Sequence, residues 1–234
     1  MSSFILKLIA IITMFIDHSN DVFIGHYTFL NILGRIAFPL FCFQIVVGFN
    51  HTRNVKKYLG RLFLFALISQ VPYSFFEYYF FHDYFYLNVF FTLFLGLLSL
   101  VILNNKRLIL PLRIILITLF MIIAQFCKTD YGALGILNII IIYLFYPFEK
   151  DKNVRVNKTI CYLLVTFEFS LLKGFTYMYQ LPLKDLLLIG IFTFVSFILT
   201  LFYNGKKGPS FKYLFYIFYP LHLALFDIFL YFIK

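Results

Sequence analysis

Ionisable residues interrupt the first two apolar stretches of the chain, and three of them could do chemistry together. Asp17 and His18 stand together near the end of the first stretch, and Arg35 follows in the second. Such groups are costly in hydrocarbon, so an ionisable residue within a membrane segment indicates a functional site by default. His18 is the candidate general base, because an imidazole can take and return a proton near neutral pH. A histidine that hydrogen-bonds for structure alone would also fit this position.

The charges around His18 suggest roles for its neighbours. Arg35 could form an ion pair with Asp17, or it could stabilise an oxyanion or a substrate carboxylate. Asp21 follows His18 by three residues, so both share a face if the helix continues, and either Asp17 or Asp21 could orient the imidazole. We predict catalytic roles for His18, Asp17 and Arg35, and place Asp21 in the substrate site.

Other polar residues lie at the expected outer ends of later apolar segments. We assign four residues to substrate binding: Asp21, Asn88, Asp130 and Tyr131. All four could converge on one polar pocket. His222 lies midway along the last apolar segment, where it could bind a ligand such as a cofactor or hydrogen-bond across helices.

Three prolines in the apolar segments, Pro39, Pro72 and Pro220, each remove a helical backbone bond. Carbonyl groups freed at membrane depth survive where protein or a wet cavity satisfies them. The prolines therefore indicate a cavity, although prolines in membrane helices can also mark simple packing kinks.

The sequence contains none of the standard motifs that bind metal ions or phosphate. No His, Cys and carboxylate spacing is typical of zinc, and there is no Gly-rich phosphate loop or nucleophile elbow. Cys42, Cys127 and Cys161 have no paired spacing. We expect no metal and no disulfide.

The composition places these residues in a membrane protein. The chain is 62% hydrophobic and 13% charged, against roughly half and a quarter in a soluble domain. We predict an all-α, polytopic membrane helix bundle that forms one integral membrane domain over residues 1–234. Segments long enough to cross about 30 Å of hydrocarbon number about nine, within a range of eight to ten: 4–24, 28–49, 57–76, 85–103, 108–126, 131–148, 159–175, 185–203 and 213–232.

The basic residues alternate between the connections of these segments. One side carries thirteen: Lys7, Arg53, Lys56, Lys57, Lys106, Arg107, Lys150, Lys152, Arg155, Lys158, Lys206, Lys207 and Lys212. The other side carries Lys128, Lys173, Lys184 and Lys234. The positive-inside rule therefore predicts a cytoplasmic N-terminus and an external C-terminus. The net charge of +10 is explained by these basic residues, which set the topology. Because the chain has no folded basic domain, we expect no nucleic-acid partner.

The basic stretch from His51 to Arg61 could also bind a ligand. Arg53, Lys56, Lys57 and Arg61 could hold the phosphates of an anionic cofactor such as a nucleotide. Lysines that only set the topology at a helix end explain the same residues equally well.

Five stretches, in this order, resemble the TraX family of membrane proteins: IAIITMFIDHSN, GRIAFPLFCFQIVVGFNHTRNVKKYLGRLFLFALISQVPY, NVFFTLFLG, TDYGALGIL and KYLFYIFYPLHL. The founding member of that family acetylates the N-terminus of pilin. The resemblance implies an integral acetyltransferase of the bacterial inner or plasma membrane that uses a buried histidine. It implies acetyl-CoA as the donor and a peptide or another envelope molecule as the acceptor, through an amine or a hydroxyl.

Two other classes of function fit the same residues. A membrane transporter or lipid-handling protein could use the polar cavity without acyl transfer, and a structural membrane component is a third reading. No internal repeat is visible in the sequence, which counts against a transporter because many transporters have related halves.

Overall fold

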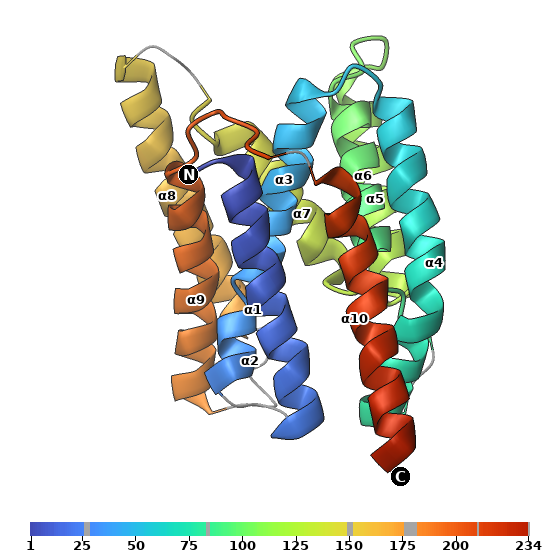
Figure 1. Cartoon of the computed structure of the whole chain (residues 1–234). Helices are drawn as coiled ribbons and strands as arrows, with labels where there is room; N and C mark the ends of the chain where they lie inside the picture. The colour runs from blue at the N-terminus through green and yellow to red at the C-terminus, as the bar shows by residue number, and fades with distance from the viewer. Residues whose placement is uncertain (26–28, 83–84, 149–151, 176–181, 210, 234) are drawn as a thin grey trace. The chain divides into compact units, whose positions relative to one another are not determined.

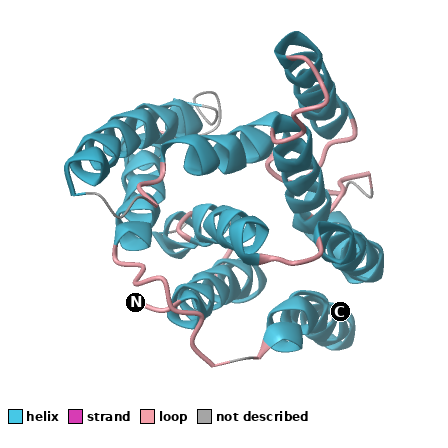
Figure 2. Ribbon diagram, turned by 90° about the horizontal axis from the view of Figure 1, so that it is seen from above, coloured by secondary structure: helices cyan, strands magenta, loops and turns pink. Residues whose placement is uncertain are grey.

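The structure is a computed structural model that describes residues 1–25, 29–82, 85–148, 152–175, 182–209 and 211–233. Within these ranges the secondary structure is helical, with loops between the helices and a single β-bridge from Leu87 to Thr129 (Figure 2). The helices are α1 (Ser3–Phe23), α2 (Phe29–Gly34), α3 (Ala37–His51), α4 (Val55–Phe81), α5 (Val89–Leu103), α6 (Leu110–Phe126), α7 (Gly132–Phe145), α8 (Lys152–Phe175), α9 (Leu183–Leu201) and α10 (Lys212–Ile233).

These helices confirm the predicted all-α fold. Each of the nine apolar segments contains a helix, and the second segment is divided between α2 and α3. Five stretches are long and apolar enough to cross a membrane, namely α1, α2 with α3, α4, α9 and α10. The apolar helices α5, α6 and α7 are shorter, with 15, 17 and 14 residues, or about 21–26 Å at 1.5 Å per residue. The chain is an integral membrane protein.

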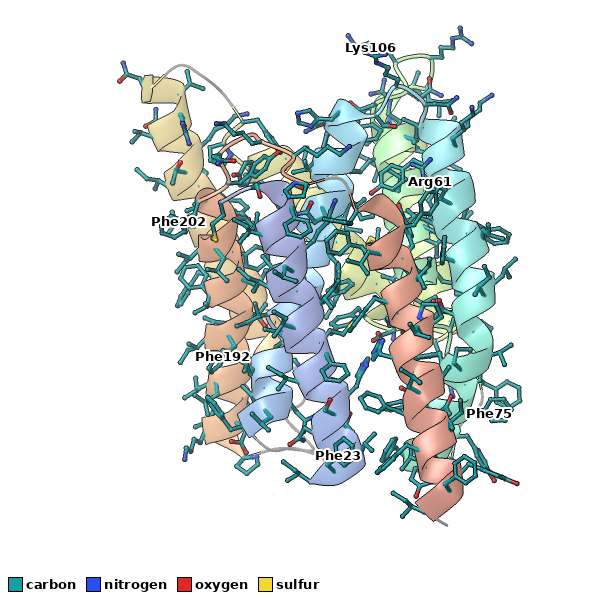
Figure 3. All side chains as sticks on the ribbon, in the orientation of Figure 1. Phe23, Arg61, Phe75, Lys106, Phe192 and Phe202 are labelled. Carbon is teal, nitrogen blue, oxygen red and sulfur yellow. The ribbon has the colours of Figure 1, made fainter. Side chains whose placement is uncertain are left out.

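The helix surfaces show which faces meet hydrocarbon. On α4, exposed apolar side chains recur every three or four residues, as at Leu64, Leu67, Val71 and Phe75. Phe75 is 57% exposed and points outward from α4 (Figure 3). A soluble helix would carry polar residues at such positions, so this face of α4 is built to contact lipid.

The chain divides into two compact units that interleave in the sequence. Unit 1 comprises Met1–Gln44 and Ile141–Ser210, and unit 2 comprises Ile45–Ile140 and Phe211–Lys234. In unit 1, α1 packs against α2, α8 packs against α9, and α2 also contacts α9. In unit 2, α4 packs against α5 and α10, and α5 packs against α6. The assignment of one domain to residues 1–234 stays a prediction.

The N-terminus of unit 1 lies beside the loop that follows α9 (Figure 1). The backbone N–H groups of Ser3 and Phe4 donate to the carbonyls of Lys206 and Lys207, at 2.9 and 3.1 Å. Lys206 and Lys207 therefore lie on the same side of unit 1 as the N-terminal end of α1. The predicted topology places these residues on one side of the membrane. Which side faces the cytoplasm stays a prediction, and Lys150 and Lys234 lie outside the described residues.

Candidate functional site

A break between two helices positions Arg35. Helix α2 ends at Gly34 and α3 begins at Ala37, and the N–H groups of Arg35 and Ile36 donate to carbonyls only three residues back, at 3.1 and 3.2 Å. The break at Arg35 and Ile36 lies just before Pro39, where the sequence predicted a lost helical backbone bond. Pro39 itself lies in the first turn of α3, a position where a missing N–H is tolerated.

Asp17 and Arg35 form an ion pair, one of the two roles that the sequence left open for Arg35. Nη2 of Arg35 lies 3.0 Å from Oδ2 and 3.3 Å from Oδ1 of Asp17. Nε of Arg35 donates to the backbone carbonyl of Asn31 at 3.1 Å. Asp17 is 8% exposed, so a buried carboxylate on α1 pairs with a half-buried guanidinium from the α2–α3 turn.

Asn31 joins the acidic residues of α1, a role that the sequence analysis missed. Its Nδ2 donates to Oδ1 of Asp17 and to Oδ1 of Asp21, both at 2.8 Å. Its Oδ1 accepts from Nδ2 of Asn20 at 2.7 Å. The available signal was an amide within an apolar stretch, one helical turn before Arg35. We call Asp17, Asn20, Asp21, Asn31 and Arg35 the α1–α2 polar cluster.

Gly34 allows this cluster to close. A Cβ atom built on Gly34 would lie 2.4 Å from Cγ and 2.5 Å from Cβ of Asp17. Real Cβ atoms essentially never approach that closely. The glycine at the end of α2 therefore lets the α2 backbone pass directly over Asp17.

His18 lies beside the cluster on α1 and is half-buried. Arg35 is close enough for its charge to act on the imidazole. Ser19, the next residue, has a buried Oγ that finds no partner in the described part of the chain. The hydrogen bond seen for Asp21 goes to Asn31, so the orientation of His18 by Asp17 or Asp21 stays a prediction.

Asn88 lies in unit 2 and is fully buried. It caps α5, where its Oδ1 accepts from the N–H of Phe90 at 3.0 Å. Its Nδ2 donates to the carbonyl of Ala66 at 2.7 Å and to Oε1 of Gln70 at 2.9 Å. These bonds tie α5 to α4, and the assignment of Asn88 to substrate binding stays a prediction.

Asp130 and Tyr131 form the turn before α7 in unit 2. The N–H of Asp130 donates to the carbonyl of Leu87 at 2.7 Å, and the carbonyl of Asp130 accepts from Oγ1 of Thr92. Tyr131 has a φ of +66°, a backbone conformation that is costly for a bulky residue. Strain of this kind clusters at functional sites, and the assignment of both residues to substrate binding stays a prediction.

His222 lies on α10 in unit 2 and is 3% exposed. Its Nδ1 is 2.8 Å from the carbonyl of Phe218, and since a carbonyl only accepts, Nδ1 carries the proton. The ring stacks on Phe218 with a centroid distance of 4.9 Å, and the ring of Tyr219 lies at 5.7 Å. The tautomer of His222 is thus fixed by its own helix, and its role toward a cofactor stays a prediction.

The basic residues assigned to a cofactor gather at the start of α4 in unit 2. Arg53, Lys56 and Lys57 are exposed, and Asn54 caps the helix by accepting from the N–H of Lys57 at 2.9 Å. Positive side chains at a helix N-terminus oppose the helix dipole. Their presence there favours an anion nearby, whether a ligand or lipid headgroups.

Arg61 lies one turn further along α4 (Figure 3). Its guanidinium carbon lies over the ring of Tyr58 at 5.5 Å from the centroid. Its Nε is buried and has no partner in the described part of the chain. A phosphate oxygen would satisfy such a donor.

Two further features concern metal ions and cysteines. The described residues contain no group of three or more His, Cys, Asp or Glu side chains that could hold a metal ion. The three cysteines are free, with Cys42 buried and both Cys127 and Cys161 exposed.

Comparison with known proteins identifies the family. A family model described as TraX protein matches residues 2–230. The chain belongs to the TraX family. A relative of this TraX chain from Dichelobacter nodosus, named "Probable fimbrial assembly protein FimC, serogroup H1", is 38% identical over 237 residues, which cover 96% of this chain and 93% of the relative. No solved structure matches this TraX chain.

Proposed function

We propose that this TraX protein is an integral membrane acetyltransferase. It transfers the acetyl group of acetyl-CoA to an amine or hydroxyl of a pilin, another peptide or a cell-envelope molecule, in the bacterial inner or plasma membrane. Family membership and the fimbrial-assembly name of the relative support a role connected with pilus proteins.

The observation that carries the proposal is the α1–α2 polar cluster beside His18. Its two acidic groups and one guanidinium are held by several hydrogen bonds among apolar helices. A charged network in a membrane segment costs free energy, so its presence indicates a function by default. An acid/base residue next to a fixed cation is the arrangement that acyl transfer needs, because a proton moves while negative charge develops on the acyl oxygen.

In this proposal His18 accepts the proton of the attacking amine or hydroxyl as the new C–N or C–O bond forms. It returns that proton to the sulfur of coenzyme A as the C–S bond breaks, so charge and atoms balance. Arg35 stabilises the acyl oxygen between these steps. A guanidinium carries five N–H donors, enough to hold Asp17 and an acyl oxygen at the same time.

The donor phosphates are assigned to the start of α4. Arg53, Lys56 and Lys57 supply charge there, and the positive end of the helix dipole adds to it. The buried Nε of Arg61 supports this assignment, since it is a donor that the described residues leave unsatisfied. His222 is the further residue assigned to the cofactor.

The test is a transfer assay with the purified protein in lipid nanodiscs. Acetyl-CoA labelled in the acetyl group is mixed with a peptide that has a free N-terminus, with the same peptide blocked at its N-terminus, and with a hydroxyl acceptor. The proposal predicts label in the acceptor and one free thiol of coenzyme A for each acetyl group transferred.

Two results would contradict the enzyme assignment. Binding of acetyl-CoA without transfer or hydrolysis, for any acceptor class, would favour a transporter or lipid-handling protein. An absence of both binding and turnover in folded protein would favour a structural membrane component. Labelling of only the hydroxyl acceptor would keep the enzyme and exclude peptide N-termini.

A further inference from the structure

The N-terminal end of α1 forms a closely packed junction within unit 1. The loop after α9 lies on it through the hydrogen bonds from Ser3 and Phe4 to the carbonyls of Lys206 and Lys207 (Figure 1). A Cβ atom built on Gly208, which has a φ of +74°, would lie 2.9 Å from Cβ of Phe4. The backbone of Lys207 is therefore held in a fixed place beside the helix.

Two positive side chains come together at this junction. Lys7 lies one turn into α1 and is half-buried, and Lys207 is close enough for its charge to act on Lys7. Both lie at the positive end of the α1 dipole. Like charges near each other are unfavourable, and an anion between the two ammonium groups would relieve that repulsion. The arrangement favours an anion.

A buried amide at the same helix end adds an unsatisfied donor. Gln44 is 7% exposed, and its Oε1 accepts from Oγ of Ser3 at 2.6 Å. This bond holds the carboxamide against the first turn of α1. Its Nε2 is buried and has no partner in the part of the chain that the structure describes. Buried polar atoms are nearly always paired, so Nε2 indicates a missing acceptor.

We propose that Lys7, Lys207 and Nε2 of Gln44 form a binding site for a phosphate ester at the N-terminal end of α1. Two ammonium groups and an amide N–H match the charge and the oxygens of a phosphate. The first N–H groups of α1 are already bonded to the loop, so the ligand binds through side chains. The phosphate belongs either to a soluble phosphate ester, bound separately from the donor phosphates that the proposed function assigns to the start of α4, or to a lipid headgroup.

The first arm of the test measures binding of adenosine 3′,5′-bisphosphate by calorimetry in phosphatidylcholine nanodiscs. Lys207→Gln removes an exposed charge, and Gln44→Glu replaces the donor by an acceptor while the bond from Ser3 can persist. Each change should weaken binding by about tenfold or more, as expected for a lost hydrogen bond to a charged group. Lys106→Gln, which changes the charge equally on an exposed loop of unit 2 (Figure 3), should leave the affinity unchanged.

The second arm counts phosphatidylglycerol molecules that stay bound when the protein is released from phosphatidylglycerol membranes, by native mass spectrometry. If both site variants bind the bisphosphate as tightly as wild type but each retains one phosphatidylglycerol molecule fewer, the site binds a lipid headgroup. If both variants fold and neither loses bisphosphate affinity nor lipid, the inference is wrong. If the wild-type protein transfers no acetyl group, and both site variants bind phosphate more weakly than wild type, the proposed function is wrong and the binding site is still supported.

Discussion

Gly34→Ala is the sharpest structural perturbation of the α1–α2 polar cluster, because it adds one methyl group directly over Asp17. That Cβ would lie 2.4 Å from Cγ of Asp17, whereas ordinary contact begins at 3.4 Å. The crowding includes Cβ of Asp17, so rotation of the carboxylate alone cannot relieve it. Either the carboxylate or the α2 backbone must retreat by about 1 Å.

A shift of that size removes the ion pair. The distance of 3.0 Å between Nη2 of Arg35 and Oδ2 of Asp17 would become too long for a hydrogen bond. Breaking a fully buried pair costs about 3–5 kcal/mol, and the Arg35 side chain is 22% exposed, so we expect about 2–3 kcal/mol. Misplacement of a catalytic group by about 1 Å can lower turnover on the order of 10²-fold, and we expect that loss here.

The assay compares acetyl transfer and melting midpoint for four proteins. Gly60→Ala is the matched control, since a Cβ on Gly60 meets nothing within 4 Å and alanine in a helix is favoured over glycine by about 0.5–1 kcal/mol. Asp17→Asn removes the charge without added volume and should lower turnover as Gly34→Ala does. Turnover of Gly34→Ala equal to wild type, with Asp17→Asn inactive, would show that the clash does not reach Asp17 and that the described packing is wrong.

Three further predictions concern other parts of the chain. Asn31→Leu leaves two carboxylates without their shared donor and should lower the melting midpoint and turnover together; a stable, active variant would contradict the role of this amide. Reporter fusions after Lys57 and after Lys158 should both report the cytoplasm, and an external signal from either would overturn the topology. Arg53→Gln combined with Arg61→Gln should raise the KM for acetyl-CoA by about tenfold with the fold intact, and an unchanged KM would leave both residues as topology markers.

The sequence predicted the helices well because hydrocarbon imposes a simple rule. Backbone groups in lipid must bond within the segment, so a long apolar stretch must be a helix. The second segment is divided into two helices at Arg35 and Ile36, close to Pro39, which predicted a lost backbone bond in this region. The turn there places the guanidinium of Arg35 against Asp17.

The contacts of the site were only partly accessible from the sequence. Opposite charges in adjacent apolar segments suggested the pair of Asp17 and Arg35, because each needs a partner in hydrocarbon. Asn31 and Gly34 gave no comparable signal, since their roles depend on how closely α1 and α2 pack. Spacing along one chain does not encode that distance.

In the proposed reaction, His18 moves the proton during acetyl transfer. The direct measurement is the release of coenzyme A thiol in the presence of acceptor, for wild type, His18→Ala and His82→Asn. His82 is exposed and ends α4 with a φ of 55°, a conformation that asparagine tolerates, so this control should keep wild-type turnover. His18→Ala should lose about 10²–10⁴-fold in turnover while it still binds acetyl-CoA. A folded His18→Ala variant that binds the donor and turns over near the wild-type rate would contradict the account.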